Sequence, residues 1–246
     1  MFPNRMLSSI PTISKDQMIE VDRVMVDDLG IGLVQMMENA GRNLARFTME
    51  AYIVNHRADR VTVLAGSGGN GGGGLVAARR LAGWDVPVSV WLSRPPDQYR
   101  GVIAHQLQAL MHVGISVEAE GAPPARSGDS SVVLDCLVGY SLTGAPRGRV
   151  SELIRWIGDS GASVVSLDIP SGVDATTGDI HDPAVVADAT LTLALPKAGL
   201  VVAHAAQNVG DLYVTDIGVP AQLYRTSFGI EVGDLFATSD IVRVQD

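Results

Sequence analysis

The hydrophobic positions of this chain follow a helical spacing near its N-terminus. Apolar residues recur with helical spacing over positions 18–25, shortly after Ser14, a residue type that commonly caps a helix. Glycines at 30 and 32 interrupt the pattern, and a second helix is predicted from about 33 to 53. These two segments predict an N-terminal helical extension.

Beyond residue 60, short apolar runs alternate with helical patterns. The runs at 61–65 and 164–167 are continuously apolar, as in strands buried on both faces. The alternation predicts one domain over residues 1–246, an α/β fold with a doubly wound, mostly parallel sheet between helical layers. Strands are expected near 61–65, 86–92, 114–118, 131–136, 163–168, 189–195 and 211–216, and helices near 73–82, 98–112 and 148–159.

A glycine-rich loop is predicted directly after the first buried strand. Seven of the nine residues from Gly66 to Gly74 are glycine, and a helical pattern follows. Glycine lets a ligand approach main-chain N–H groups, and a helix N-terminus adds unpaired donors and a positive dipole end. The segment therefore predicts a backbone cradle for an anionic or polar ligand, with a flexible connector as the alternative.

The glycine tract matches a dinucleotide fingerprint only in part. Gly66–Gly71 fits the G-x-G-x-x-G spacing. In a tract with so many glycines, however, this spacing arises easily by chance and is weak evidence for a dinucleotide site. The carboxylate that should follow the next strand is missing, since Ser93 and Arg94 stand there. No Gly-Lys-Ser/Thr closes the tract either. A nicotinamide-dependent dehydrogenase and a P-loop nucleotidase are both disfavoured.

Composition and charge narrow the class of protein further. The chain of 246 residues is 46% hydrophobic and 18% charged, which is typical of a globular domain. Its formal net charge of −9 argues against a nucleic-acid partner, and no basic run suggests a membrane surface. A single cysteine, Cys136, excludes an internal disulfide. With no apolar signal segment at the N-terminus, these features predict a soluble, cytoplasmic protein.

Polar residues follow three of the predicted strands, where ligands bind in open α/β sheets. Asp135 and Asp168 each terminate an apolar run, and Ser171 follows the second of them. With Asn70 from the glycine tract, these oxygen ligands suit a hard cation better than a transition metal. The alternative is that both carboxylates only cap turns. Lys197 follows another strand, and either reaches the same edge or is a solvated loop residue.

Five motifs in one order resemble the YjeF N-terminal-domain family, the NAD(P)H-hydrate epimerases. The resemblance extends over about residues 12–220. It rests on Met36–Gly41 (MMENAG), the glycine tract, Asp135–Gly139, Asp168–Gly172 and Pro196–Leu200.

The resemblance implies a Rossmann-like fold and an isomerase that interconverts the R and S epimers of hydrated NADH and NADPH in nicotinamide nucleotide repair. It implies that Asp168 is the acid/base or charge-stabilising residue. A potassium ion would be held by Asn70, Asp135 and Ser171. Substrate contacts would come from Gly69, Asn70, Gly71, Gly72, Gly73, Gly139, Tyr140, Ser141, Leu142, Thr143, Gly144, Ala145 and Asp168.

The chain departs from the family pattern in the glycine tract. Gly69 and Gly73 replace the first Asn and the terminal Asp of the family's Asn-Asn-Gly-Gly-Asp loop. A non-catalytic YjeF-like module that binds a nucleotide-like ligand or dimerises is therefore the alternative hypothesis.

Two partners are also expected. A separate NAD(P)H-hydrate dehydratase would consume the S epimer. A homodimer is the second expectation, because Met36, Met37, Phe47 and Met49 could form a dimer face on the helix at 33–53, although core packing would explain these residues equally well.

Overall fold

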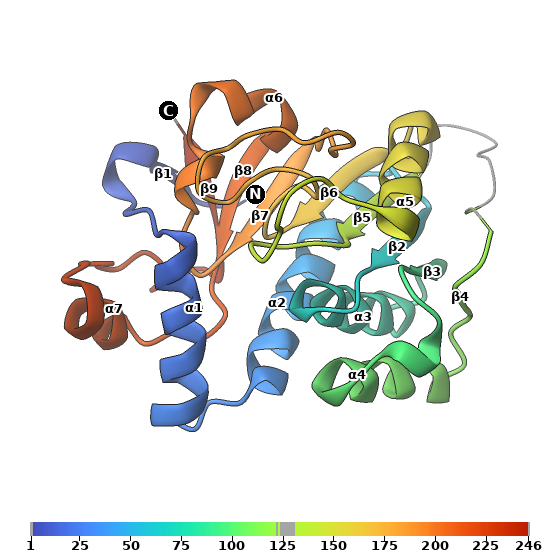
Figure 1. The fold of residues 1–246 in the computed structure, drawn as a ribbon, viewed down its shortest axis with the longest axis horizontal. Coiled ribbons are helices and arrows are strands. Elements are labelled where there is room, and N and C mark those ends of the chain that lie inside the picture. Colours follow the sequence, from blue (N-terminus) through green and yellow to red (C-terminus); the bar gives the residue numbers. More distant parts are fainter. Residues whose placement is uncertain (1, 122, 124–130, 246) are drawn as a thin grey trace.

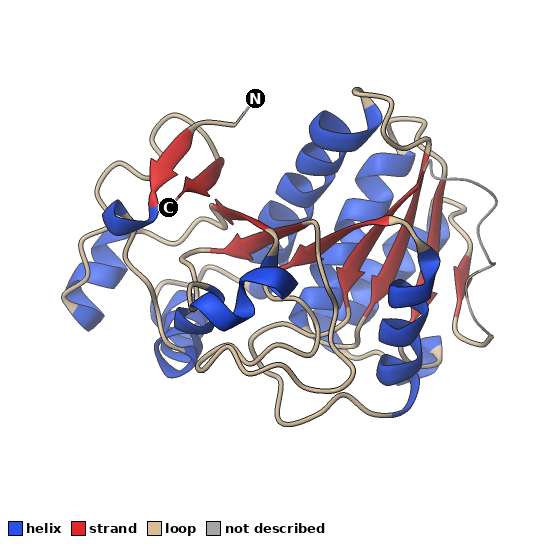
Figure 2. Cartoon of the chain, turned by 90° about the horizontal axis from the view of Figure 1, so that it is seen from above, coloured by secondary structure: helices blue, strands red, loops and turns tan. Residues whose placement is uncertain are grey.

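The computed structural model describes residues 2–121, 123 and 131–245. In this part of the chain, nine strands form one sheet in the order β1-β9-β8-β7-β6-β5-β2-β3-β4 (Figures 1 and 2). Neighbouring strands are parallel except for the β8–β9 pair. The strands are β1 (Asn4–Met6), β2 (Arg60–Ala65), β3 (Val88–Leu92), β4 (Val117–Glu118), β5 (Ser131–Cys136), β6 (Ser163–Leu167), β7 (Ala189–Leu193), β8 (Asp211–Thr215) and β9 (Ile241–Gln245).

Helices cover both faces of the sheet. On β2, Val63 packs in one hydrophobic cluster with residues of α2, α3 and α4, whereas Leu64 packs in another with residues of α5. The alternation of side chains along a strand thus divides the core into two layers. The helices are α1 (Lys15–Arg23), α2 (Leu33–Thr48), α3 (Gly69–Ala82), α4 (Gly101–His112), α5 (Gly148–Ser160), α6 (Ala206–Val209) and α7 (Ala221–Phe228).

The predicted doubly wound, mostly parallel sheet is confirmed. Each of the seven predicted strands has a counterpart, and the N-terminal extension forms as α1 and α2, each prolonged by a π-helical turn. Ser14 caps α1, accepting a hydrogen bond from the N–H of Gln17, whose side chain accepts one from the Ser14 N–H. The sequence pattern did not indicate β1, β9 and α7, which lie near the two ends of the chain, or the short helix α6.

The glycine tract is not an open loop over its whole length. Helix α3 begins at Gly69, four residues earlier than predicted, so neither a nine-residue loop nor a flexible connector is present. A Cβ on Gly71 would lie 1.8 Å from the carbonyl oxygen of Gly66, and one on Gly41 of α2 would lie 2.5 Å from that of Gly73. Close packing of α3 therefore outweighs the poor helix propensity of glycine.

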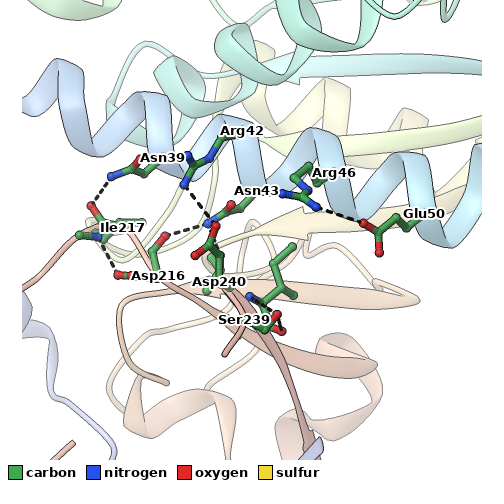
Figure 3. A network of polar contacts seen from close by, with 12 residues as sticks. Asn39, Arg42, Asn43, Arg46, Glu50, Asp216, Ile217, Ser239 and Asp240 are labelled. Atoms are coloured by element: carbon green, nitrogen blue, oxygen red, sulfur yellow. Dashed lines mark hydrogen bonds and ion pairs between the residues drawn. The ribbon is translucent and has the colours of Figure 1, made fainter. Parts of the chain in front are cut away.

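Polar contacts of the MMENAG segment hold α2 in place. Glu38 pairs with Arg79 and Arg80 of α3. Asn39 donates to the carbonyl oxygen of Ile217 at 3.0 Å, within the network that joins α2 to the segments around β8 and β9 (Figure 3). Ile217 also lines the cavity described in the next subsection, so this network positions part of the cavity wall.

The methionine and aromatic side chains of α2 belong to the interior. Met36, Met37 and Phe47 are buried, and Met49, just beyond the helix, is half-buried. Core packing thus accounts for these four residues within a single chain. No helix in the described ranges has both the length and the apolar character needed to cross a membrane. One further segment, 121–130, is rich in proline, serine and glycine, and this composition predicts a loop. Apart from residues 121 and 123, it lies outside the described residues.

Candidate active site

A cavity of about 560 Å³ opens beyond the carboxyl ends of β2, β5, β6 and β7. The chain adds β3 and β4 on one side of β2, whereas β5 to β8 follow on the other. The cavity therefore lies at the switch point of the strand order, the usual ligand site of such sheets. Its lining includes Gly69 and Asn70 of α3, Gly139 and Tyr140 after β5, Asp168 after β6, Lys197 after β7, and Asp22 of α1.

Asp168 is a nearly fully buried carboxylate in the wall of this cavity. Its side chain is only 4% exposed, and its backbone has a φ of 67°, a value uncommon for residues other than glycine. One carboxylate oxygen accepts a hydrogen bond from the ammonium of Lys197 and another, of 3.3 Å, from the N–H of Leu193. The other accepts the N–H of Tyr140 at 3.2 Å. Residues from the ends of β5 and β7, the two strands that flank β6, therefore orient this carboxylate.

Lys197 is the counter-ion of Asp168 and is fully buried. Besides the ion pair, its ammonium donates to the carbonyl oxygen of Leu193 at 2.7 Å. The hypothesis of a solvated loop lysine is therefore wrong. The position of Lys197 directly after Pro196 at a strand end was the available signal, but a sequence does not reveal which charge the side chain meets.

Asp135 and Ser171 meet in a buried hydrogen-bonded cluster. Asp135 is fully buried and accepts from the Ser171 hydroxyl at 2.6 Å, the Ser171 N–H at 2.8 Å and the Ser166 hydroxyl at 2.9 Å. Burial raises the pKa of the Asp135 carboxyl, and the hydrogen bonds from Ser171 and Ser166 oppose that rise. The cluster joins β5 to β6 and to the turn after β6, so Asp135 also has the turn-holding role proposed as the alternative.

Asn70 lies in the first turn of α3 and has different partners. Its amide group donates to the carbonyl oxygen of Leu167 at 2.9 Å, and its side-chain oxygen is buried with no hydrogen-bond partner. An unpaired buried acceptor is uncommon in folded proteins. Among the described residues, no group of three or more His, Cys, Asp or Glu side chains is placed to hold a metal ion.

The remaining predicted substrate contacts divide into two groups. Gly69, Gly139 and Ser141 line the cavity. Neither the glycines at 71–73, which lie inside α3, nor the loop residues 142–145 line it. A hydrogen bond of 3.1 Å from the ammonium of Lys15 to the carbonyl oxygen of Leu142 connects this loop to α1. Substrate contact by all these residues stays a prediction.

Asp22 also lines the cavity, although the sequence pattern did not single it out. Its carboxylate accepts a hydrogen bond from the Tyr140 hydroxyl. Burial raises the pKa of Asp22, whereas the bond from Tyr140 opposes the rise. The available signal was a carboxylate one helical turn after Met18, next to the apolar positions Val21 and Met25.

Comparison with known proteins places the chain in a family. An NAD(P)H-hydrate epimerase of Dehalogenimonas lykanthroporepellens is 44% identical over 88% of this chain and 85% of its own length. A bifunctional NAD(P)H-hydrate repair enzyme Nnr of Thermofilum pendens is 36% identical over 84% of this chain but only 40% of its own length.

A solved structure has the same fold. The crystal structure of the yeast protein ynu0 matches 95% of this chain and all of its own with a TM-score of 0.80, at 22% identity. The family model described as YjeF-related protein N-terminus matches residues 33–199, which include four of the five sequence motifs in full together with the three polar strand ends. This chain belongs to the YjeF-related protein N-terminus family.

Proposed function

We propose that this protein is an NAD(P)H-hydrate epimerase, an isomerase that interconverts the R and S epimers of hydrated NADH and NADPH. The observation that carries the proposal is the buried Asp168 carboxylate, held by Lys197 in the cavity wall of a chain 44% identical to a protein of that name. The sequence resemblance assigns the acid/base role to this same residue.

The chemistry of epimerisation suits such a carboxylate. One route to inversion at the hydroxyl-bearing ring carbon is that the hydroxyl leaves and that water returns to the other side. Loss of the hydroxyl as water leaves a cation shared between that carbon and the ring nitrogen. A buried carboxylate stabilises this cation and accepts or delivers the proton at oxygen.

The N-terminus of α3 suits the phosphate groups of a nucleotide. Ser67, Gly68 and Gly69 line the cavity where the 14-residue helix begins. The first N–H groups of a helix have no partners within it, and the helix dipole favours negative charge at that end. We therefore expect the pyrophosphate of the substrate to bind here, with the hydrated ring near Asp168.

Chiral chromatography of hydrated NADH and NADPH tests the activity directly. The protein should accelerate the approach to the equilibrium mixture from either pure epimer, relative to a sample without protein. The non-catalytic module is the second candidate, favoured by the missing side chains at Gly69 and Gly73. Clean binding of both epimers with no acceleration would establish that module instead.

Gly69→Asn should strengthen substrate binding several-fold. A Cβ at Gly69 meets no atom within 4 Å, and the residue lines the cavity, so a side chain there can reach the ligand. One added hydrogen bond contributes about 1 kcal/mol, roughly a factor of five in KM. Gly158→Asn on α5, which also has open space, is the matched control. Equal KM values for the two variants would show that position 69 makes no productive contact.

Asn70, Asp135 and Ser171 are proposed to hold a potassium ion. The support is the unpartnered, buried side-chain oxygen of Asn70, together with the oxygen-rich Asp135–Ser171 cluster, which suits a hard cation. Such an ion would supply fixed positive charge beside the phosphate-binding end of α3. It would also give the Asn70 oxygen the partner it lacks.

Potassium chloride should raise the melting temperature more than equal concentrations of sodium or choline chloride. A ligand at 100 times its Kd stabilises a protein by about 2.7 kcal/mol. Asp135→Asn should abolish the difference between the salts, and the exposed-site control Asp179→Asn should keep it. Identical melting curves of the wild type in all three salts would refute the ion site.

The wider context follows from the proposed activity. We expect the protein to act in the cytoplasm, where nicotinamide nucleotides are used, and a dehydratase to consume one of the epimers. Relatives named bifunctional repair enzymes support a linked second activity, since this chain spans only about 40% of the one from Thermofilum pendens. A homodimer is proposed without an assigned interface.

A further inference from the structure

Two carboxylates in the cavity are connected through a single residue, Tyr140. Its backbone N–H donates to Asp168 at 3.2 Å, and its hydroxyl donates to Asp22. Asp168 follows β6, whereas Asp22 comes from α1, so the two carboxylates reach the cavity from different layers of the fold. All three residues line the same cavity.

Epimerisation needs proton transfer on both faces of the substrate ring. When the hydroxyl departs from one face, an acid on that face must protonate it. When water adds to the other face, a base there must accept the proton. Microscopic reversibility exchanges these roles for the opposite epimer. Asp168 alone, fixed by bonds to Lys197, Leu193 and Tyr140, serves one face.

We infer that Asp22 is a second catalytic residue, the acid/base group for the ring face opposite Asp168, with Tyr140 as its positioning residue. This inference rests on the proposed epimerase function. Asp22 gives its proton to the departing hydroxyl, the carbon–oxygen bond breaks, and water leaves. The lone pair of the ring nitrogen completes a carbon–nitrogen double bond. A second water attacks from the other face and gives its proton to Asp168, and exchange with solvent resets both groups.

The surroundings of the two carboxylates differ in a way that suits these roles. The Asp168 carboxylate pairs directly with the ammonium of Lys197. Asp22 faces the Tyr140 hydroxyl, with Lys197, Asp168 and Tyr224 of α7 also within electrostatic range. Burial raises the pKa of Asp22, so this carboxyl keeps a proton to higher pH than an exposed aspartate. Pairs of carboxyl groups in such unlike environments commonly divide acid and base roles.

Oxygen-18 exchange separates the two faces experimentally. Each pure epimer of hydrated NADH is incubated in ¹⁸O water with wild type, Asp22→Asn or Asp168→Asn, and with no protein to measure spontaneous reaction. Inversion and label uptake are followed by chiral chromatography and mass spectrometry. Asp22→Asn should slow inversion by about 100-fold. It should still catalyse label uptake with retention in the one epimer whose hydroxyl faces Asp168.

Asp168→Asn should show the mirror pattern, with residual label uptake in the other epimer. Tyr140→Phe keeps the Asp22 carboxyl but removes the hydroxyl that positions it. The rate of inversion should therefore fall less than in Asp22→Asn. Asp27→Asn, an exposed change shortly after α1, is the control with unchanged rates. The pH profile of Asp22→Asn should also lack one of the two limbs of the wild-type profile.

Several results would overturn the role of Asp22. An Asp22→Asn variant that inverts the substrate at the wild-type rate would overturn it. An Asp22→Asn variant that loses label exchange and inversion equally in both epimers would also overturn it, because equal losses indicate a structural role. An Asp22→Asn variant that does not fold would leave Tyr140→Phe and the wild-type pH profile as the test. In that case, the role of Asp22 would be rejected if Tyr140→Phe kept the wild-type rates and the pH profile of the wild-type rate had only one limb. A wild-type protein that accelerates neither process would instead refute the epimerase function.

Discussion

Asp168→Asn should reduce epimerisation by about 10²- to 10⁴-fold, the range for loss of a general acid/base group. The amide matches the carboxylate in size but carries no charge to stabilise a cationic ring and accepts no proton. Its single amide oxygen can replace only one of the two acceptors that Lys197 and the Tyr140 N–H use, and the buried ammonium loses its anion. The variant should therefore also be less stable, and rates are compared at a temperature where urea unfolding shows that it is folded. Initial rates from each pure epimer, measured by chiral chromatography, give the effect.

The control for this variant is an aspartate outside the cavity. Asp179→Asn removes an exposed carboxylate from the segment that follows the same strand, and should leave the rate unchanged. Binding of a non-reacting nucleotide such as NADPH should be nearly equal for wild type and Asp168→Asn, because the phosphates bind elsewhere. A rate within a factor of two of wild type would exclude Asp168 from the chemistry.

Lys197→Met should destabilise the protein by about 3–5 kcal/mol, the cost of removing one partner from a buried ion pair. Methionine keeps the length of the side chain but leaves the Asp168 carboxylate buried without its cation. Urea unfolding at pH 7 measures the loss.

The double variant Lys197→Met/Asp168→Asn separates charge from packing. It replaces the ion pair with two neutral side chains, so it should recover most of the stability lost in Lys197→Met while staying inactive. Losses that simply add in the double variant would show that Lys197 stabilises the fold through packing rather than through Asp168. A lysine-to-methionine change at an exposed position cannot replace the double variant as the control. Lys197 is fully buried, so an exposed lysine would not reproduce its packing.

The sequence predicted the sheet well because continuous apolar runs and helical spacing are local signals. The strands around 61–65 and 131–136 and the cap at Ser14 could be recognised from neighbouring residues alone. The glycine tract was the main error. Glycine favours loops in isolation, and the close packing of α3 against both α2 and the sheet explains why residues 69–74 are helical.

The sequence by itself determined the fold class, the family and the strand ends that carry polar residues, since each depends on the order of residue types along the chain. Only the tertiary structure decided which charges meet. Asp168 is 29 residues from Lys197, and Asp22 is 118 residues from Tyr140. Such pairs depend on how strands and helices pack, and burial then sets their energies through desolvation. The catalytic roles proposed for Asp168 and Asp22 therefore depend on side chains that approach one another only in the folded chain.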